Sequence, residues 1–118
     1  MRKILLLTLL LATLDATDLS QYINKQNCSQ IIDKQVFTIC YDYEAKGAKY
    51  VSYTLDGTKV NSINIKKRSK FYTEKNLPNQ YRSHNKDYTH SGYDRGHLAN
   101  DASFDYDKKV VAKTYTIG

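Results

Sequence analysis

The sequence of 118 residues contains no tryptophan, one proline, one methionine and only two cysteines. It has no internal repeat, no low-complexity tract and no linker-like stretch. It also lacks an apolar run of the roughly twenty residues that a membrane-spanning helix requires. These absences, together with a mean hydropathy of −0.63, exclude a multi-domain protein and an integral membrane protein. They predict one small, polar domain.

The single marked hydrophobic segment lies at the N-terminus. Two basic residues precede the mostly apolar residues Ile4–Leu14, and the small residue Ala16 follows. This pattern is typical of a secretory signal peptide, and a buried first helix is the alternative. We therefore predict a signal peptide over residues 1–16, one domain over residues 17–118, and an exported protein that is periplasmic or extracellular. No cysteine directly follows the apolar run, which argues against a lipid anchor.

Cys28 and Cys40 form an even pair in a chain that is predicted to be exported. An oxidising compartment favours a disulfide between them. The bond would close a loop of about a dozen residues and contribute on the order of 3 kcal/mol to stability. Two separate buried thiols are the alternative. A structural zinc site is disfavoured because the sequence has no CxxC spacing and two thiols supply only half of a tetrahedral ligand set.

Three segments carry strand signals. Residues 35–41 are rich in β-branched and aromatic side chains, and residues 50–55 alternate before the pair Asp56-Gly57. An Asp-Gly pair between alternating runs is typical of a type I′ hairpin, so residues 58–65 are the expected third strand, with an open register. These segments predict an antiparallel sheet in an α+β fold. The remaining expectations are a short helix within residues 18–33, a turn at 44–47, a loop at 77–82, a helical turn within 105–112 and a strand starting at 114–117.

The net charge of +6 and the pI near 9.2 favour a polyanionic partner such as nucleic acid. A basic run at residues 66–70 lies directly before Phe71 and Tyr72. Such runs are usually solvated surface, which is the first interpretation. The alternative is a site that attracts phosphates and stacks on bases. Arg82 is a further candidate for binding substrate phosphate.

The densest cluster of chemically active side chains spans residues 87–97, with the sequence DYTHSGYDRGH. A neutral imidazole such as that of His97 can take a proton from water near neutral pH. The guanidinium of Arg95 can hold a phosphate by paired hydrogen bonds. The carboxylate of Asp94 can orient either group. Proton transfer and anion binding are therefore available within one segment, and a surface salt-bridge cluster is the alternative.

The block SGYDRGHLA at residues 91–99, with Asp87-Tyr88 ahead of it, resembles the DRGH signature of the DNA/RNA non-specific endonucleases, a family of the ββα-metal (His-Me finger) nuclease superfamily. The resemblance extends over roughly residue 40 to the C-terminus. It implies an antiparallel sheet that leads into a ββα-metal motif, here incomplete. It also implies hydrolysis of phosphodiester bonds in DNA and RNA with little sequence preference, assisted by one divalent cation per site, usually Mg²⁺.

The resemblance also implies residue roles. His97 matches the general base that activates the attacking water. Asp94 and Arg95 match positions that support the site and contact phosphate or the water shell of the metal, and Gly96 matches a position at which the backbone turns. His90 falls in a variable position and is interpreted as a surface residue.

The sequence departs from the family pattern at the metal ligand. In the family this ligand is an Asn on a helix that follows the motif and a second strand. After His97 the chain has only Asn100, which precedes the expected strand and is interpreted with Asp101 as the cap of a turn. No metal ligand is therefore assigned, and we expect a C-terminally truncated or partial nuclease domain with weak or no activity. The alternatives are an exported, non-catalytic nucleic-acid-binding module and a small secreted interaction protein.

Overall fold

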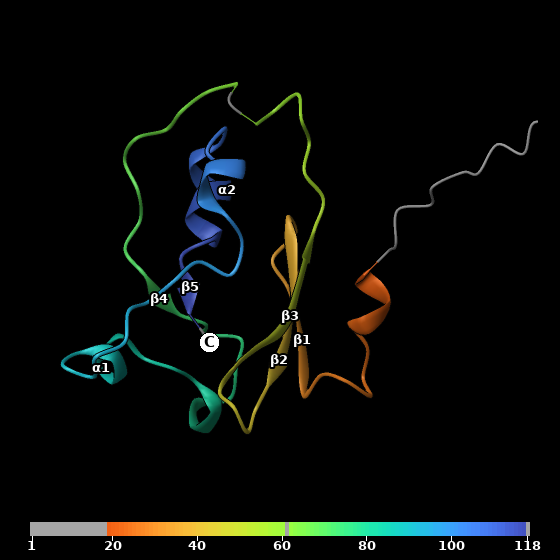
Figure 1. Ribbon diagram of the computed structural model, residues 1–118, viewed down its shortest axis with the longest axis vertical. Helices are drawn as coiled ribbons and strands as arrows, with labels where there is room; N and C mark the ends of the chain where they lie inside the picture. The colour runs from red at the N-terminus through yellow and green to blue at the C-terminus, as the bar shows by residue number, and fades with distance from the viewer. Residues whose placement is uncertain (1–18, 61, 118) are drawn as a thin grey trace, which may run out of the picture.

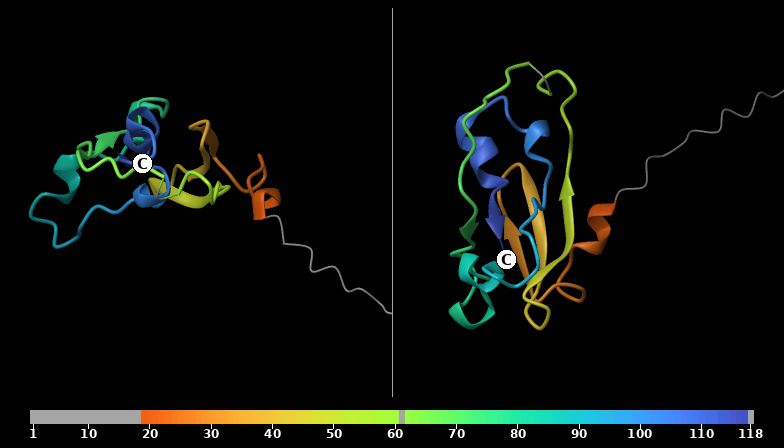
Figure 2. Two further views of the ribbon diagram at one scale, coloured as in Figure 1. Left: turned by 90° about the horizontal axis from the view of Figure 1, so that it is seen from above. Right: turned by 60° about the vertical axis from the view of Figure 1, so that its left-hand side comes forward.

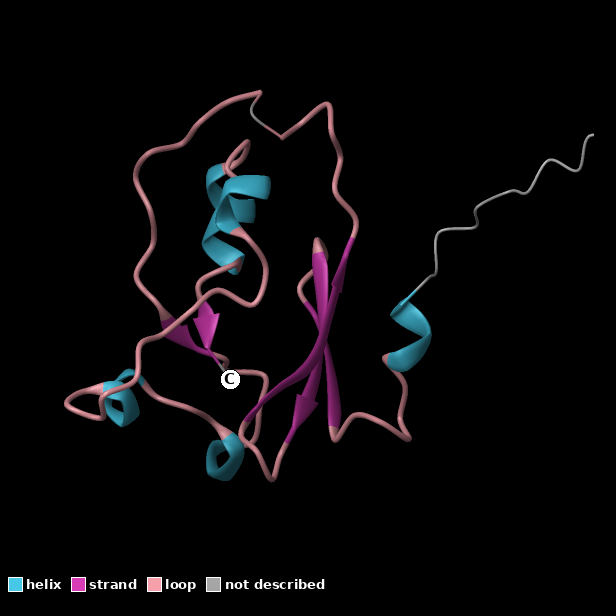
Figure 3. Cartoon of the chain, viewed as in Figure 1, coloured by secondary structure: helices cyan, strands magenta, loops and turns pink. Residues whose placement is uncertain are grey.

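Two small sheets, joined by a long connection, organise the protein (Figure 1). The structure, a computed structural model, describes residues 19–60 and 62–117, and Figure 3 shows its helices and strands by colour. In chain order the elements are the 3-10 helix η1 (Leu19–Tyr22), the strands β1 (Gln30–Asp33), β2 (Phe37–Asp42), β3 (Gly47–Tyr53) and β4 (Tyr72–Thr73), the 3-10 helix η2 (Asn79–Tyr81), the helix α1 (Asn85–Tyr88), the 3-10 helix η3 (Asp101–Ser103), the helix α2 (Lys108–Lys113) and the strand β5 (Thr116–Ile117).

The predicted signal peptide, residues 1–16, lies outside the described residues, so the signal peptide and the boundary of the domain that follows it stay predictions. Within residues 19–60 and 62–117, no helix combines the length and the hydrophobicity that crossing a membrane requires.

Strands β1, β2 and β3 form an antiparallel sheet with β2 at its centre. Ile39 of β2 pairs with Ile32 on one side and with Val51 on the other. The inner face of this sheet packs against later parts of the chain, including Leu77 and Phe104, to form the core. Alternating β-branched and aromatic side chains suit such a half-buried pleated surface. The predicted α+β class with an antiparallel sheet is confirmed, whereas the ββα-metal arrangement stays a prediction.

The third strand of this sheet is not the predicted one. The hairpin at Asp56-Gly57 is wrong, because the described residues between 58 and 65 contain no strand. The Asp56 carboxylate instead accepts hydrogen bonds from the backbone N–H of Thr58, at 3.0 Å, and from its hydroxyl, at 2.7 Å. The Asp56 carbonyl then accepts the N–H groups of Lys59 and Val60, which closes a helical turn. Aspartate side chains stabilise turns of this kind in competition with strand pairing.

The third strand is instead β1, which pairs with β2 at the edge of the sheet opposite β3, whereas the hairpin strand was expected beside β3. A short helix within residues 18–33 is confirmed only at its start, as η1, and Gln30–Asp33 is a strand. Ile32 is buried against β2, whereas Ile63, in the segment expected to be a strand, is 58% exposed. Burial of an apolar side chain is worth roughly 1.5–3 kcal/mol, which stabilises the strand that carries Ile32.

The second sheet pairs β4 with β5 in parallel, with Tyr72 opposite Thr116 and Thr73 opposite Ile117. Helix α2 leads directly into β5. The Asp107 carboxylate begins α2 by accepting the N–H groups of Lys109 and Val110 at 2.7 and 3.1 Å. The predicted helical turn and the predicted C-terminal strand are therefore confirmed, with the helix a few residues later than expected.

The connection from β3 to β4 arches past α2 before it descends to β4 (Figures 1 and 2). It is fastened to the segment before α2 by a backbone hydrogen bond from Ile65 N–H to the Asp105 carbonyl at 3.2 Å. The Lys59 ammonium also lies 5.3 Å from the centre of the Tyr106 ring. These contacts hold the connection beside the segment before α2. The basic run of residues 66–70 follows them in the chain and ends shortly before β4.

The predicted disulfide is present. Cys28 and Cys40 are bonded with their Cα atoms 5.1 Å apart. The bond fastens the segment before β1 to the centre of β2, where Cys40 is fully buried. It therefore adds a covalent link to the same two strands that the backbone hydrogen bonds pair.

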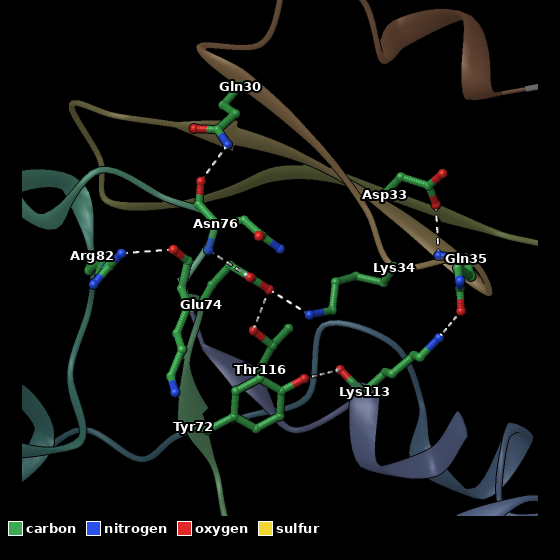
Figure 4. A network of polar contacts seen from close by, with 11 residues as sticks. Gln30, Asp33, Lys34, Gln35, Tyr72, Glu74, Asn76, Arg82, Lys113 and Thr116 are labelled. Atoms are coloured by element: carbon green, nitrogen blue, oxygen red, sulfur yellow. Dashed lines mark hydrogen bonds and ion pairs between the residues drawn. The ribbon is translucent and has the colours of Figure 1, made fainter. Parts of the chain in front are cut away.

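A buried polar network joins the two sheets (Figure 4). The Lys34 ammonium, after β1, lies 2.7 Å from Glu74 Oε2, directly after β4, and their side chains are 12% and 3% exposed. Thr116 of β5 donates its hydroxyl to the same oxygen at 3.0 Å, and the Asn76 N–H donates to Oε1 at 3.1 Å. The Glu74 carboxylate is thus paired and hydrogen-bonded, as a buried charge must be.

Candidate active site

The DRGH segment lies in the loop between α1 and η3, which residues 89–100 form. Helix α1 begins with a reciprocal cap in which the His84 N–H donates to the Asp87 carboxylate at 2.7 Å. His90 and Gly92 then adopt left-handed backbone angles, with φ of 57° and 82°. The chain therefore turns ahead of the motif, and Gly92 supplies the freedom a residue with a Cβ would lack. Gly96, expected to be the turning glycine, is outside the left-handed region, and a Cβ there would meet nothing within 4 Å.

His97 lies between two aromatic rings. The centre of its imidazole is 5.0 Å from that of Phe71 and 4.4 Å from that of Tyr115, which it meets edge to face. Its side chain keeps 28% of its surface exposed, so one part of the ring faces solvent. Its Nε2 atom lies 3.8 Å from Asp101 Oδ2. The imidazole is therefore held in place by packing while still accessible to water.

Asp101 is the centre of a small charged network beside this imidazole. Its Oδ2 atom accepts the Tyr115 hydroxyl at 2.9 Å and lies 3.2 Å from Arg68 Nε. Burial first, and then the hydrogen bond and the negative charge of Asp101, raise the pKa of Tyr115 above its ordinary value of 10.0. Tyr115 therefore stays protonated and continues to donate to Asp101 at neutral pH.

Arg68 joins a second carboxylate to this network. Its Nη2 atom donates to Asp105 Oδ2 at 3.1 Å. Asp105 is buried, and its Oδ1 atom has no hydrogen-bond partner among the described residues. The interpretation of the basic run as solvated surface thus holds for its exposed lysines, Lys66, Lys67 and Lys70, but not for Arg68, which points inward.

Arg95 also contacts Phe71, and Asn85 is its hydrogen-bond partner. Its Nη1 atom donates to Asn85 Oδ1 at 2.7 Å, and its guanidinium carbon lies 5.3 Å from the centre of the Phe71 ring. The Asn85 amide in turn donates to the Phe71 carbonyl at 2.9 Å. Asn85 therefore fixes Arg95 against Phe71, the same ring that packs on His97.

A cleft of about 520 Å³ opens beside this arginine. Its walls come from the residue directly before β4, from α1 and from the loop that follows α1: Phe71, Asn85, Tyr88, Thr89, Tyr93, Asp94 and Arg95. The structure thus brings Asp94 and Arg95 together in one cleft and places His97 next to it through Phe71. Asp94 is exposed at the cleft, and its assigned supporting role stays a prediction.

Arg82 lies outside the residues that line the cleft. Its guanidinium donates to the carbonyls of Leu77 and Lys75, each at 2.7 Å, and to Asn79 Oδ1 at 2.5 Å. These bonds hold the loop around η2, so Arg82 has a structural role. Its contact with substrate phosphate stays a prediction. His90 is exposed, as expected of a surface residue.

A comparison with protein families agrees with the motif. A family model described as DNA/RNA non-specific endonuclease matches residues 15–117. The chain belongs to this endonuclease family. It is similar to human mitochondrial endonuclease G, with 28% identity over 87 residues that cover 74% of this chain and 29% of the relative. It is also similar to the mitochondrial nuclease EXOG of Xenopus laevis, with 28% identity over 102 residues, 86% of this chain and 25% of the relative.

The chain spans about a quarter of the length of these curated relatives. The family that the DRGH motif predicted is confirmed. Phe71, Asn85 and Tyr115 contact the motif residues, and Arg68 contacts Asp101 beside His97; the sequence did not predict these roles. No local pattern marks them, because only the fold brings these segments to the DRGH loop.

Nucleases of this endonuclease family are typically dependent on a divalent metal. Among the described residues, no three His, Cys, Asp or Glu side chains gather into a group that could bind an ion. Asp101 and Asp105, the carboxylates closest to His97 in the network, are both paired with Arg68. The described residues therefore do not fit the cation, and Asn100 is engaged as the cap of η3, accepting the Ala102 N–H at 3.1 Å.

Proposed function

We propose that this chain provides the catalytic base and a phosphate-binding arginine of a nuclease that cleaves phosphodiester bonds in DNA and RNA without sequence preference. The observation that carries the proposal is that His97 and Arg95 both pack against one ring, Phe71. A base and an anion-binding group held at a fixed separation can act on one phosphate and its attacking water.

In this proposal His97 accepts the proton of the attacking water through the part of its ring that faces solvent. Asp101 acts as a positioning residue, because its carboxylate lies beside Nε2 and attracts the imidazolium that forms. Tyr115 and Arg68 hold that carboxylate in place from two other directions. Arg95 offsets the negative charge that develops on the phosphate oxygens.

The family resemblance adds a divalent cation, proposed to be Mg²⁺, which would polarise the phosphate when bound. Because the described residues do not fit it, the roles above are derived from the chain's own groups alone. Export from the cytoplasm is a further part of the proposal, supported by the N-terminal sequence and by the disulfide, which is stable in an oxidising compartment.

The first prediction tests the base. His97→Ala should lower the rate of plasmid nicking and of RNA cleavage in Mg²⁺ by about 10²-fold or more, because the proton acceptor is lost. His90→Asn is the matched control, since His90 is exposed and asparagine tolerates its left-handed backbone; it should cleave at the wild-type rate. Undiminished cleavage by His97→Ala would show that another group is the base.

The second candidate function is an exported, non-catalytic module that binds nucleic acid. The net charge of +6 and the exposed lysines of the basic run favour it. Gel-shift and cleavage assays on the same protein separate the two. Salt-sensitive binding without cleavage in Mg²⁺, Mn²⁺ or Ca²⁺ would support the module, and cleavage abolished by His97→Ala would support the nuclease.

A further inference from the structure

The cleft beside Arg95 has walls of mixed chemistry. Phe71, Tyr88 and Tyr93 contribute aromatic rings, Arg95 a cation and Asp94 a carboxylate. Its volume of about 520 Å³ lies within the roughly 300–1,000 Å³ of typical small-ligand sites. A ligand that matches this combination needs a flat ring, a negative charge and hydrogen-bond donors. One nucleotide, with its base, phosphate and polar base edge, has all three.

Tyr93 is the most unusual of these residues. Its side chain is 78% exposed, the largest exposure recorded among the large hydrophobic residues that the structure describes. It follows Gly92, whose left-handed backbone turns the loop outward, and it directly precedes Asp94 and Arg95. An exposed aromatic ring at the mouth of a polar cleft has no role in the core. It is well placed to stack on the face of a base.

The charges in the cleft orient such a ligand. Arg95 is held by Asn85 at one of its nitrogen atoms, and its remaining N–H groups can bind a phosphate. Asp94 only accepts hydrogen bonds and repels phosphate, so it favours the donor edge of a base. We propose that the cleft is a subsite for one unpaired nucleotide of a nucleic acid, with its phosphate on Arg95 and its base stacked on Tyr93.

This inference rests on the proposed function and adds a substrate preference to it. In a duplex both faces of a base are stacked and its polar edge is paired, so the base cannot enter the cleft without leaving the helix. A single strand or a loop offers its bases without that cost. The site should therefore bind and cleave single-stranded DNA and RNA in preference to the matched duplex.

The test measures binding separately from cleavage. The full chain carrying His97→Ala is titrated with a single-stranded oligonucleotide that contains one 2-aminopurine, and with the same oligonucleotide in a duplex. Stacking should quench the 2-aminopurine fluorescence in the single strand only. Adding Tyr93→Ala should weaken single-strand binding on the order of 10-fold, whereas Tyr93→Phe, which keeps the ring, should not. Tyr50→Ala, an exposed tyrosine outside the cleft, is the matched control and should bind as its parent does.

The outcomes separate this inference from the proposed function. Equal affinity for duplex and single strand, unquenched fluorescence, or unchanged binding by Tyr93→Ala would overturn the subsite even if the wild-type chain cleaves nucleic acid. Tyr93-dependent, quenched binding of single strands would support the subsite even if the chain cleaves nothing. Because Tyr93 is so exposed, its substitution leaves the core packing intact, and the Tyr93→Phe variant reports on the ring itself.

Discussion

At the scale of single residues, Phe71 is the residue that contacts both His97 and Arg95. The ring contacts the imidazole at 5.0 Å between centres and the guanidinium at 5.3 Å. An aromatic face attracts a cation without donating to it or competing for its hydrogen bonds. Phe71 can therefore position both groups while leaving their polar atoms to water and phosphate.

Asp101→Asn should separate positioning from binding. Asparagine can still accept the Tyr115 hydroxyl but carries no charge to attract a protonated His97, so we expect kcat to fall on the order of tenfold while KM is unchanged. A merely structural role would lower the amount of folded protein and leave kcat per folded molecule unchanged. A rise in KM without a change in kcat would contradict the assignment.

The same variant has a readout that needs no activity. Burial and then Asp101 raise the pKa of Tyr115. Loss of the negative charge of Asp101 should move the pKa of Tyr115 down towards 10.0, whereas the contribution of burial remains. A titration of ¹³C-labelled tyrosine followed by NMR, assigned with Tyr115→Phe, measures this change.

The residues that could be predicted from the sequence are those within the DRGH segment. Asp94, Arg95 and His97 lie within four consecutive positions, so a local pattern identifies them. Asp94 and Arg95 line the cleft. Arg68 and Tyr115 could not be predicted, because Arg68 looks like any member of a basic run and Tyr115 like any strand residue. Their role depends on contacts with Asp101 that only the folded chain makes.

At the scale of elements, the prediction succeeded where the signal is local. The strand β2, the disulfide, α2 and β5 each follow from residues close in sequence. The hairpin failed because Asp56 can form either a tight hairpin turn or a helical one, and the choice depends on burial that a local pattern does not contain. The pairing of β4 with β5 could not be predicted, since the two strands are short and distant in the chain.

The buried pair of Lys34 and Glu74 links these elements and gives a stability prediction. Lys34→Met leaves the Glu74 carboxylate buried without its cation, and should lower the free energy of unfolding by about 3 kcal/mol. Lys34→Met combined with Glu74→Gln leaves no unpaired charge and should cost less. Lys59→Met is the control, because the Lys59–Asp56 pair is exposed and the Lys59–Tyr106 contact is a single cation–π interaction, so their loss should cost about 1 kcal/mol or less. Urea unfolding at neutral pH measures all three.

The pH dependence of this pair has a definite sign. Burial alone would raise the pKa of Glu74, but hydrogen bonds from Lys34 and Asn76 hold the pKa below its ordinary 4.5. This stabilisation is therefore present above pH 4.5 and lost as the pH falls through the folded-state pKa. Burial alone would lower the pKa of Lys34, but Glu74 raises it above 10.5, so that contribution is lost only in alkali. If the stability of the Lys34→Met, Glu74→Gln double variant falls with acid as steeply as that of the native chain, other groups cause the loss of stability in acid.

At the scale of the whole molecule, the arched connection from β3 to β4 (Figure 1) contains the basic run of residues 66–70. This run directly precedes Phe71, one of the residues that line the cleft. Arg68 turns inward to Asp101 and Asp105, so the exposed charge of the run comes from its lysines. We expect these lysines to bind the backbone of a nucleic acid whose nucleotide lies in the cleft.

This arrangement predicts how binding depends on salt. Each phosphate that a lysine neutralises contributes about 0.7 to the slope of log affinity against log salt concentration for a single strand. Lys66→Gln combined with Lys67→Gln should therefore lower the magnitude of that slope by about 1.4, and weaken binding to all sequences alike. The measurement is fluorescence anisotropy of a labelled single strand over a range of salt concentrations, with His97→Ala in every protein to prevent cleavage.

The control is the pair Lys108→Gln and Lys109→Gln, which removes the same charge from exposed positions of α2, outside the residues that line the cleft. An equal loss of slope in both pairs would show that net charge alone attracts the polyanion, whereas a loss confined to the first pair would place the bound strand along the arch.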